Sequence, residues 1–193
     1  LGLDPGPFAP EIVLSPSDRD SAREICENHG LENRYAVLCP FTTRPQKHWI
    51  EARWVETATH VATEFNLTIV LLGGPQDAAA SRRIRSRTEV KIVDFTGQTT
   101  LGQAAAVVEQ AALVIGVDTG LTHLVTAFKR PTIALFGATC PYLTTSKSRT
   151  IVVYNRLTCS PCKRKPTCAG RYDCMKAIGS DDVYRAVRRL MEN

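Results

Sequence analysis

Short apolar segments alternate with helical patterns along most of this chain, and this alternation constrains the fold more than any other feature. The apolar runs stop at glycine, proline or polar residues, as buried strands do, and occupy residues 35–39, 67–72, 90–94, 113–117, 132–136 and 151–154. Apolar residues recur at helical spacing in residues 51–65, 77–87, 100–110, 121–128 and 181–191. This alternation with short connections predicts an α/β fold, a parallel sheet with helices on both faces.

The first 33 residues differ from the rest, and we expect them to form a linker and a lead-in helix. Prolines at positions 5, 7, 10 and 16 keep the start extended, and residues 18–28 have a helical pattern. Residues 34–193 then form one domain, a size that a single hydrophobic core supports. The chain begins with leucine rather than methionine, which indicates a fragment of a longer protein.

No segment has the features of a signal peptide or of a membrane span. The longest apolar run, residues 67–72, is far too short to cross a bilayer. The amino-terminal residues lack a basic start followed by an apolar stretch. These observations predict a cytoplasmic protein.

The net charge of +5 favours anionic partners, and much of the excess lies between residues 147 and 189. Nothing in the sequence resembles a nucleic-acid-binding module, so we expect no nucleic acid as a partner. A solvated basic face is the ordinary explanation of such charge. Peripheral contact with the inner face of an anionic membrane is a further hypothesis.

Four of the seven cysteines form the cluster C-x2-C-x5-C-x5-C within residues 159–174. Cys159, Cys162, Cys168 and Cys174 are dense enough to hold a structural zinc ion as thiolates. The second pair lacks the close spacing of a zinc ribbon, and a reducing compartment disfavours disulfides. Structural zinc, reduced thiols and a disulfide formed during isolation all remain open.

Polar loops follow three of the predicted strands, whose carboxyl ends should meet at one edge of the sheet. The loop after the first strand contains Thr42, Thr43 and Lys47. Two hydroxyl donors and an ammonium group suit a phosphate, although an ordinary polar loop has the same composition. We expect Trp49, which starts the next helix, to serve packing.

The loops after the second and third strands suit a nucleoside less specifically. Gly73 and Gly74 let a ligand approach the backbone, and Asp77 either accepts hydrogen bonds from a ribose diol or caps its helix. Residues 95–100 follow the third strand and are placed to lie under a base. The chain has no GxGxxG loop and no P-loop lysine, which argues against Rossmann dinucleotide binding and against a P-loop NTPase.

The segment Asp118-Thr119-Gly120-Leu121-Thr122-His123 follows the fourth strand. A carboxylate, a hydroxyl and a glycine at the start of a helix suit an anionic, hydroxyl-rich ligand, because helix-start amides bind phosphate oxygens. Asp and Thr are also ordinary helix caps, so a purely structural role is the alternative here.

Taken in order, these motifs resemble those of the heptosyltransferases of lipopolysaccharide core synthesis, glycosyltransferase family 9. The resemblance rests on Thr-Thr-x3-Lys-x-Trp, Gly-Gly-Pro, Asp-Thr-Gly-Leu-Thr-His and Pro-Thr-Ile-Ala-Leu-Phe-Gly-Ala-Thr-x-Pro, and it is strong over residues 35–141. It implies the carboxyl-terminal, donor-binding half of a GT-B enzyme, in which two Rossmann-like domains face each other. The implied donor is ADP-heptose, with no further cofactor required.

The same resemblance assigns roles to ten residues of the donor site. Thr42, Thr43 and Lys47 would contact the diphosphate, and Asp77 would contact the adenosine ribose. Asp118 would bind hydroxyls of the transferred sugar. Thr119, Gly120 and Leu121 offer further contacts to the diphosphate, and His123 supports the loop. Thr99 lies near the adenine position, where the family often has a larger apolar residue, so the base is less well specified than the phosphates.

The resemblance also implies that the catalytic base and the acceptor site lie in the amino-terminal domain, which this chain lacks. Asp118 is the one candidate base here, and sugar binding is its favoured role. We therefore expect the chain alone to bind the donor with little or no transfer to the lipopolysaccharide precursor. Two alternatives are another GT-B enzyme that uses a UDP- or TDP-sugar, and a non-catalytic nucleotide-binding module.

Overall fold

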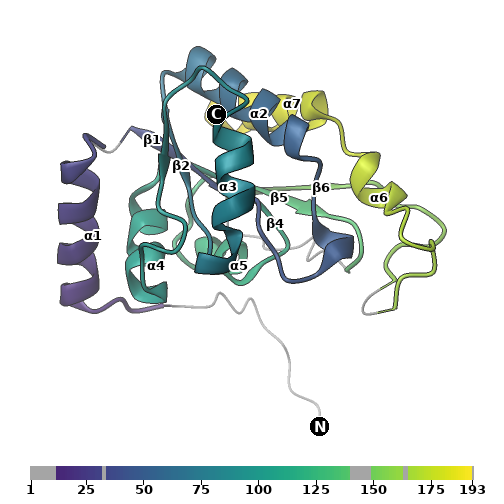
Figure 1. Cartoon of the computed structure of the whole chain (residues 1–193), viewed down its shortest axis with the longest axis horizontal. Coiled ribbons are helices and arrows are strands. Elements are labelled where there is room, and N and C mark those ends of the chain that lie inside the picture. The colour runs from purple at the N-terminus through teal and green to yellow at the C-terminus, as the bar shows by residue number, and fades with distance from the viewer. Residues whose placement is uncertain (1–11, 32–33, 140–148, 163–164, 193) are drawn as a thin grey trace, which may run out of the picture.

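The computed structural model describes residues 12–31, 34–139, 149–162 and 165–192. Their strands form one six-stranded sheet in which all neighbours are parallel, in the order β3-β2-β1-β4-β5-β6 (Figure 1). The strands are β1 (Tyr35–Cys39), β2 (Thr68–Leu71), β3 (Ile92–Asp94), β4 (Leu113–Val117), β5 (Thr132–Phe136) and β6 (Thr150–Tyr154). The predicted parallel α/β sheet is confirmed, and its strand order is that of the Rossmann fold.

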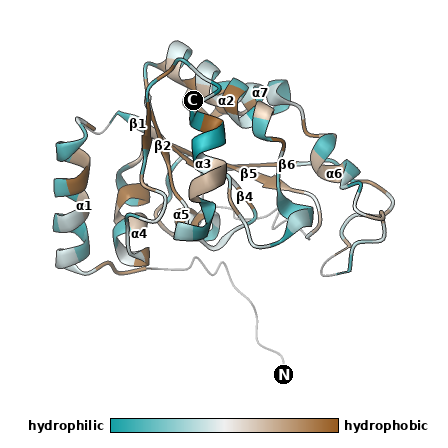
Figure 2. Ribbon diagram, in the orientation of Figure 1, coloured by the Kyte–Doolittle hydropathy of each residue, from teal (hydrophilic) through white to brown (hydrophobic). Residues whose placement is uncertain are grey.

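Helices cover both faces of this sheet. One face carries α2 (Glu51–Phe65), α3 (Ala78–Arg85), α6 (Asp173–Lys176) and α7 (Ser180–Met191), and the other carries α1 (Pro16–Asn28), α4 (Leu101–Gln110) and α5 (Gly120–Ala127). Successive strand side chains alternate between the two cores: Ala36 and Leu38 belong to the first, Val37 and Cys39 to the second. In Figure 2 the central strands are brown, the colour of hydrophobic residues, whereas the helices carry both colours.

Helix α1 packs beside α4 and contributes to the second core (Figure 1). Ala22 and Cys26 are buried, and the Arg19 guanidinium pairs with the Glu109 carboxylate on α4 at 2.8 Å. The predicted lead-in helix therefore exists and covers the same sheet as the rest of the chain. The expectation that Pro16 keeps the chain extended is wrong, because Pro16 is the first residue of α1, where proline is well tolerated. Residues 1–11 of the predicted linker lie outside the described residues, and the boundary at residue 33 stays a prediction.

Three local features differ from the predicted pattern. The strand expected at residues 90–94 is shortened to Ile92–Asp94. The helix expected at 77–87 is a 3-10 turn, Pro75–Asp77, followed by α3, and the Asp77 carboxylate accepts from the Gly74 amide at 2.9 Å rather than capping α3. The sequence pattern did not predict α6. Among the described helices, none is long and apolar enough to cross a membrane.

The start of α2 is fixed to the carboxyl-terminal part of the chain. Trp49 is buried, and its indole Nε1 donates to the Ile178 carbonyl at 2.9 Å. Its ring makes an edge-to-face contact with Trp54, with centroids 5.0 Å apart. The Arg53 guanidinium donates to the Lys176 carbonyl at 2.6 Å as well as to the Ile178 carbonyl. The predicted packing role of Trp49 is confirmed, and this contact closes the loop that carries Lys47.

Candidate functional site

A cavity of about 410 Å³ opens where the loops after β1, β2 and β4 meet. This is the edge at which parallel α/β sheets bind ligands, at the point where strand order reverses between β1 and β4. Eight of the ten residues expected to contact a donor line it: Thr42, Thr43, Lys47, Asp77, Asp118, Thr119, Gly120 and Leu121. The loops after the first, second and fourth predicted strands are therefore brought together, whereas residues 95–100, after the third strand, contribute no lining residue.

The other two expected donor residues lie outside this lining. The His123 side chain is 45% exposed and contacts Asp118, which agrees with a supporting role. Thr99 is half-buried just before α4 and is not among the lining residues. The geometry gives Thr99 no contact with the cavity, so its place near a base stays a prediction.

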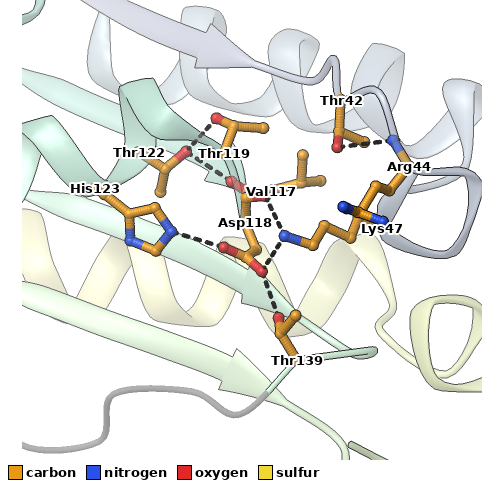
Figure 3. A network of polar contacts seen from close by, with 9 residues as sticks. All are labelled: Thr42, Arg44, Lys47, Val117, Asp118, Thr119, Thr122, His123 and Thr139. Atoms are coloured by element: carbon orange, nitrogen blue, oxygen red, sulfur yellow. Dashed lines mark hydrogen bonds and ion pairs between the residues drawn. The ribbon is translucent and has the colours of Figure 1, made fainter. Parts of the chain in front are cut away.

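Asp118 is the centre of a polar network in the cavity wall (Figure 3). Its Oδ2 lies 2.6 Å from the Lys47 ammonium and accepts a further hydrogen bond from the Thr139 hydroxyl. Its Oδ1 lies 2.7 Å from His123 Nε2. Lys47 also donates to the Asp118 main-chain carbonyl, at 3.2 Å. The side chains of Asp118 and Lys47 are only 8% and 17% exposed, so this is a largely desolvated ion pair.

These contacts decide the charge of Asp118. Burial alone would raise the pKa of its carboxyl, but hydrogen bonds from His123, Lys47 and Thr139, together with the Lys47 charge, outweigh it. The pKa of Asp118 therefore lies well below its ordinary value. The residue is a carboxylate at every physiological pH and a poor acceptor of a proton.

Each partner reaches Asp118 from a different element. Lys47 ends the 3-10 turn Pro45–Lys47 after β1, His123 lies in the first turn of α5, and Thr139 lies just beyond β5. The sequence motif contained His123 and Lys47 as donor-site residues. Thr139 was part of the motif that contains β5, but nothing in the sequence pattern indicated its contact with Asp118.

The loop after β4 is held by hydroxyl groups rather than by a helix cap. Thr119 is the residue before α5, and its side chain makes no capping hydrogen bond. The fully buried Thr122 hydroxyl donates to the Val117 carbonyl at 2.7 Å and lies 3.3 Å from the Thr119 hydroxyl. Gly116 makes room for this hydroxyl, because an added Cβ would lie 2.1 Å from Thr122 Oγ1. The helix-cap alternative for Asp118 and Thr119 is therefore not supported.

Several lining residues were not predicted from the sequence, among them Phe41, Arg44, Gln76 and Leu101. Leu101 is the most informative, because it is a large apolar side chain that is 69% exposed at the start of α4. An apolar residue directly after a helix-capping threonine was the available signal. Cys39 also lines the cavity, and burial raises the pKa of its thiol to about 12, so it stays protonated.

The cysteine cluster holds free thiols. Cys168 and Cys174 are buried, and Cys159 and Cys162 are partly exposed. Within the described part of the chain, no three Cys, His, Asp or Glu side chains are grouped as a metal ion requires. The structural zinc that the spacing allowed stays a prediction.

A family model described as glycosyltransferase family 9 (heptosyltransferase) matches residues 1–173. Lipopolysaccharide heptosyltransferase 1 of Salmonella typhimurium is 38% identical over 114 residues, which are 59% of this chain and 35% of that protein. The protein of the same name from Pseudomonas aeruginosa is 34% identical over 137 residues, 69% of this chain and 37% of that protein. The chain thus spans little more than a third of the length of these relatives.

Solved structures agree on the fold. A glycosyltransferase family 9 protein from Veillonella parvula superposes with a TM-score of 0.81 at 23% identity, covering 94% of this chain and 53% of that one. The Escherichia coli ADP-heptose heptosyltransferase II superposes with a TM-score of 0.77 at 22% identity, covering 98% of this chain and 55% of that one. The Escherichia coli heptosyltransferase WaaC with ADP superposes with a TM-score of 0.63 at 27% identity, covering 81% of this chain and 44% of that one.

Proposed function

Because the chain belongs to glycosyltransferase family 9 (heptosyltransferase), we propose that it is the donor-binding half of an inverting glycosyltransferase that takes heptose from ADP-heptose. The acceptor that we propose is the inner core of a lipopolysaccharide precursor. The observation that carries the proposal is the cavity at the carboxyl edge of the sheet, with Lys47 and Asp118 paired in its wall. A cation beside a carboxylate offers one group for a diphosphate and another for sugar hydroxyls.

The diphosphate is proposed to lie between Lys47 and the start of α5. Thr42 and Thr43 add hydroxyl donors from the loop after β1. An added Cβ at Gly120 would meet no described atom within 4 Å, so packing within the protein does not require glycine there. The space left by Gly120 belongs to the cavity and lets an anion approach the helix-start amides.

The transferred sugar is proposed to lie against Asp118. An ionised carboxylate accepts hydrogen bonds from two hydroxyls, and its depressed pKa keeps that capacity at neutral pH. Lys47 must exchange part of its contact with Asp118 for the diphosphate when the donor binds. That exchange neutralises the leaving group and leaves the acceptor position that Lys47 occupied on Oδ2 for a sugar hydroxyl.

The nucleoside is proposed to lie over the loops after β2 and β3. Asp77 lines the cavity and accepts from the Gly74 amide, which orients its carboxylate for a ribose diol. The exposed Leu101 side chain supplies an apolar surface for the base. Thr99 keeps its expected place near adenine as part of this proposal.

We place the catalytic base outside this chain. A general base works best with a pKa near the working pH, whereas the pKa of Asp118 is held far lower by its three donors. Asp118 therefore binds the sugar, and a residue from the amino-terminal half takes the proton of the acceptor hydroxyl. The chain alone is expected to bind ADP-heptose and to transfer little or no heptose.

We propose a cytoplasmic protein that contacts the inner face of the membrane peripherally, where a lipopolysaccharide precursor would be met. The support is the excess of basic residues near the carboxyl end of the chain. Sedimentation with anionic and neutral vesicles tests the contact. Equal binding to both would contradict it.

Isothermal titration tests donor binding directly. We expect ADP and ADP-heptose to bind with measurable heat, and Lys47→Met to weaken both. Lys91→Met is the matched control, because the Lys91 ammonium contacts only the His29 carbonyl at 3.4 Å among the contacts that the structure shows. Tighter binding of UDP or TDP than of ADP would favour another GT-B enzyme. A folded chain that binds no nucleotide would refute the proposal.

A further inference from the structure

The cysteine-bearing segment, residues 159–162 and 165–175, packs against the end of β5 beside the candidate site. We propose that this segment positions the Asp118 carboxylate for the donor sugar, acting through Gly137 and Thr139. Ser160 and Thr139 are then positioning residues, and the segment serves the sugar end of the site. The inference rests on the proposed role of Asp118 as the sugar-binding residue.

The first step is the contact between Thr139 and Asp118. Oδ2 of Asp118 accepts from both Lys47 and Thr139 (Figure 3). Once Lys47 turns to the diphosphate, Thr139 is the donor that still holds Oδ2, while His123 holds Oδ1. In Figure 3 these two side chains reach the carboxylate from different elements, so together they fix the plane of the carboxylate.

The second step is the hydrogen bond from Ser160 to the backbone just after β5. The Ser160 side chain is buried, and its hydroxyl donates to the Gly137 carbonyl, two residues before Thr139. The same hydroxyl lies 3.2 Å from the Tyr154 hydroxyl at the end of β6, the strand next to β5. Ser160 thus ties the cysteine-bearing segment to the ends of both strands.

The third step is the close packing of sulfur atoms around Gly137. An added Cβ there would lie 2.6 Å from Met175 Sδ and 2.8 Å from Cys174 Sγ. Cys174, Met175 and Ala138 are all buried, so little free volume surrounds the strand end. Because interiors are close-packed, the backbone that carries Thr139 cannot shift without moving the segment.

A role in core packing alone predicts a different result from a positioning role. Loss of packing would lower stability and weaken every ligand of the site together. Loss of positioning would weaken the ligand that touches Asp118, ADP-heptose, and spare ADP, which lacks the sugar. The ratio of the two dissociation constants therefore separates the two roles.

The experiment titrates ADP and ADP-heptose into the full 193-residue chain and its variants. Thr139→Val removes the hydroxyl at nearly constant volume, and we expect about tenfold weaker binding of ADP-heptose with less than about a twofold change for ADP. Ser160→Ala leaves every donor to Asp118 in place. We expect it to weaken binding of ADP-heptose about threefold and to leave binding of ADP nearly unchanged. Thr139→Ser retains a hydroxyl and should restore most of the affinity for ADP-heptose.

The controls make each outcome decisive. Asp118→Asn sets the full size of the selective loss. Ser180→Ala removes a hydroxyl that binds the Glu56 carboxylate at 2.6 Å on the exposed surface. It should change the affinity for neither ligand. The inference would be overturned if the variants lost affinity equally for ADP and ADP-heptose. It would also be overturned if neither Thr139→Val nor Ser160→Ala lost affinity for ADP-heptose. A wild-type chain that fails to bind ADP would instead overturn the proposed function, and the inference with it.

Discussion

The Lys47–Asp118 ion pair gives the sharpest prediction, because it is expected to serve stability and donor binding in different ways. Lys47→Met removes the ammonium at similar length, and Asp118→Asn removes the charge at constant shape. Both side chains are largely buried, and their charged atoms are 2.6 Å apart. We expect each single variant to be less stable than the wild type, and the double variant to be more stable than the sum of the two losses implies.

The magnitude follows from the geometry. Two unit charges at this distance attract by about 6 kcal/mol at an effective dielectric constant of about 20. Most of this attraction offsets the desolvation of two partly buried ions. The net contribution of a hydrogen bond to a charged group is about 1.5–3 kcal/mol. Asp118 keeps His123 and Thr139 as donors when Lys47 is removed, so we expect about 2 kcal/mol per single variant and a coupling energy of about 2 kcal/mol.

Urea denaturation at pH 7 measures these free energies of unfolding. Both tryptophans, Trp49 and Trp54, are buried, so their fluorescence reports the transition. Titration with ADP on the same proteins separates the functions: Lys47→Met should lose affinity, and Asp118→Asn should keep it. Strictly additive stability changes, with a coupling energy below about 0.5 kcal/mol, would refute the reasoning that this pair is one desolvated unit.

Three further predictions concern the pH dependence of stability, the proposed contact of Leu101 with the nucleobase, and the packing of Gly116 beneath the loop after β4. The pKa of Asp118 is lower in the folded than in the unfolded chain, so its contribution to stability is complete above a pH of about 4 and is lost as the pH falls further. Denaturation of the wild type and of Asp118→Asn from pH 7 to pH 3 should therefore give a stability difference that shrinks on acidification; a constant difference would contradict the ionised state. Leu101→Ser should weaken ADP binding severalfold at unchanged melting temperature, whereas Val13→Ser, at a 91% exposed position that does not line the cavity, should change neither the ADP affinity nor the melting temperature. Gly116→Ala should destabilise the chain by about 1–3 kcal/mol, because its Cβ would overlap the buried Thr122 hydroxyl, and unchanged stability would show that this hydroxyl moves freely.

The sequence predicted the features that depend on local pattern. Apolar runs such as residues 113–117 are buried on both faces of the sheet, and this makes parallel strands recognisable without any partner. Loops at strand ends necessarily meet at one edge, so Lys47 and Asp118 could be assigned to one site before their distance was known.

The contacts that the sequence did not reveal depend on side chains far apart in the chain. The Thr139 contact with Asp118 spans 21 positions, and the Ser160 contact with Gly137 spans 23. No periodic pattern encodes such pairs, because they depend on how one strand end packs on another. Asp77 was expected as a helix cap or a ribose ligand. Its carboxylate accepts a hydrogen bond from the Gly74 amide, because a short polar side chain can also bind main-chain groups a few residues away.

The hydrogen bond from Trp49 to the Ile178 carbonyl has a consequence for the order of events during synthesis. Among the residues that the structure describes, those that line the cavity all lie at or before position 121, so a ribosome-bound chain has them soon after β4 emerges. The loop that carries Lys47, however, is closed by an anchor that is translated more than fifty residues later. Nucleotide capture is therefore expected only when the segment around residue 178 has left the ribosome, even though that segment contributes no lining residue to the cavity.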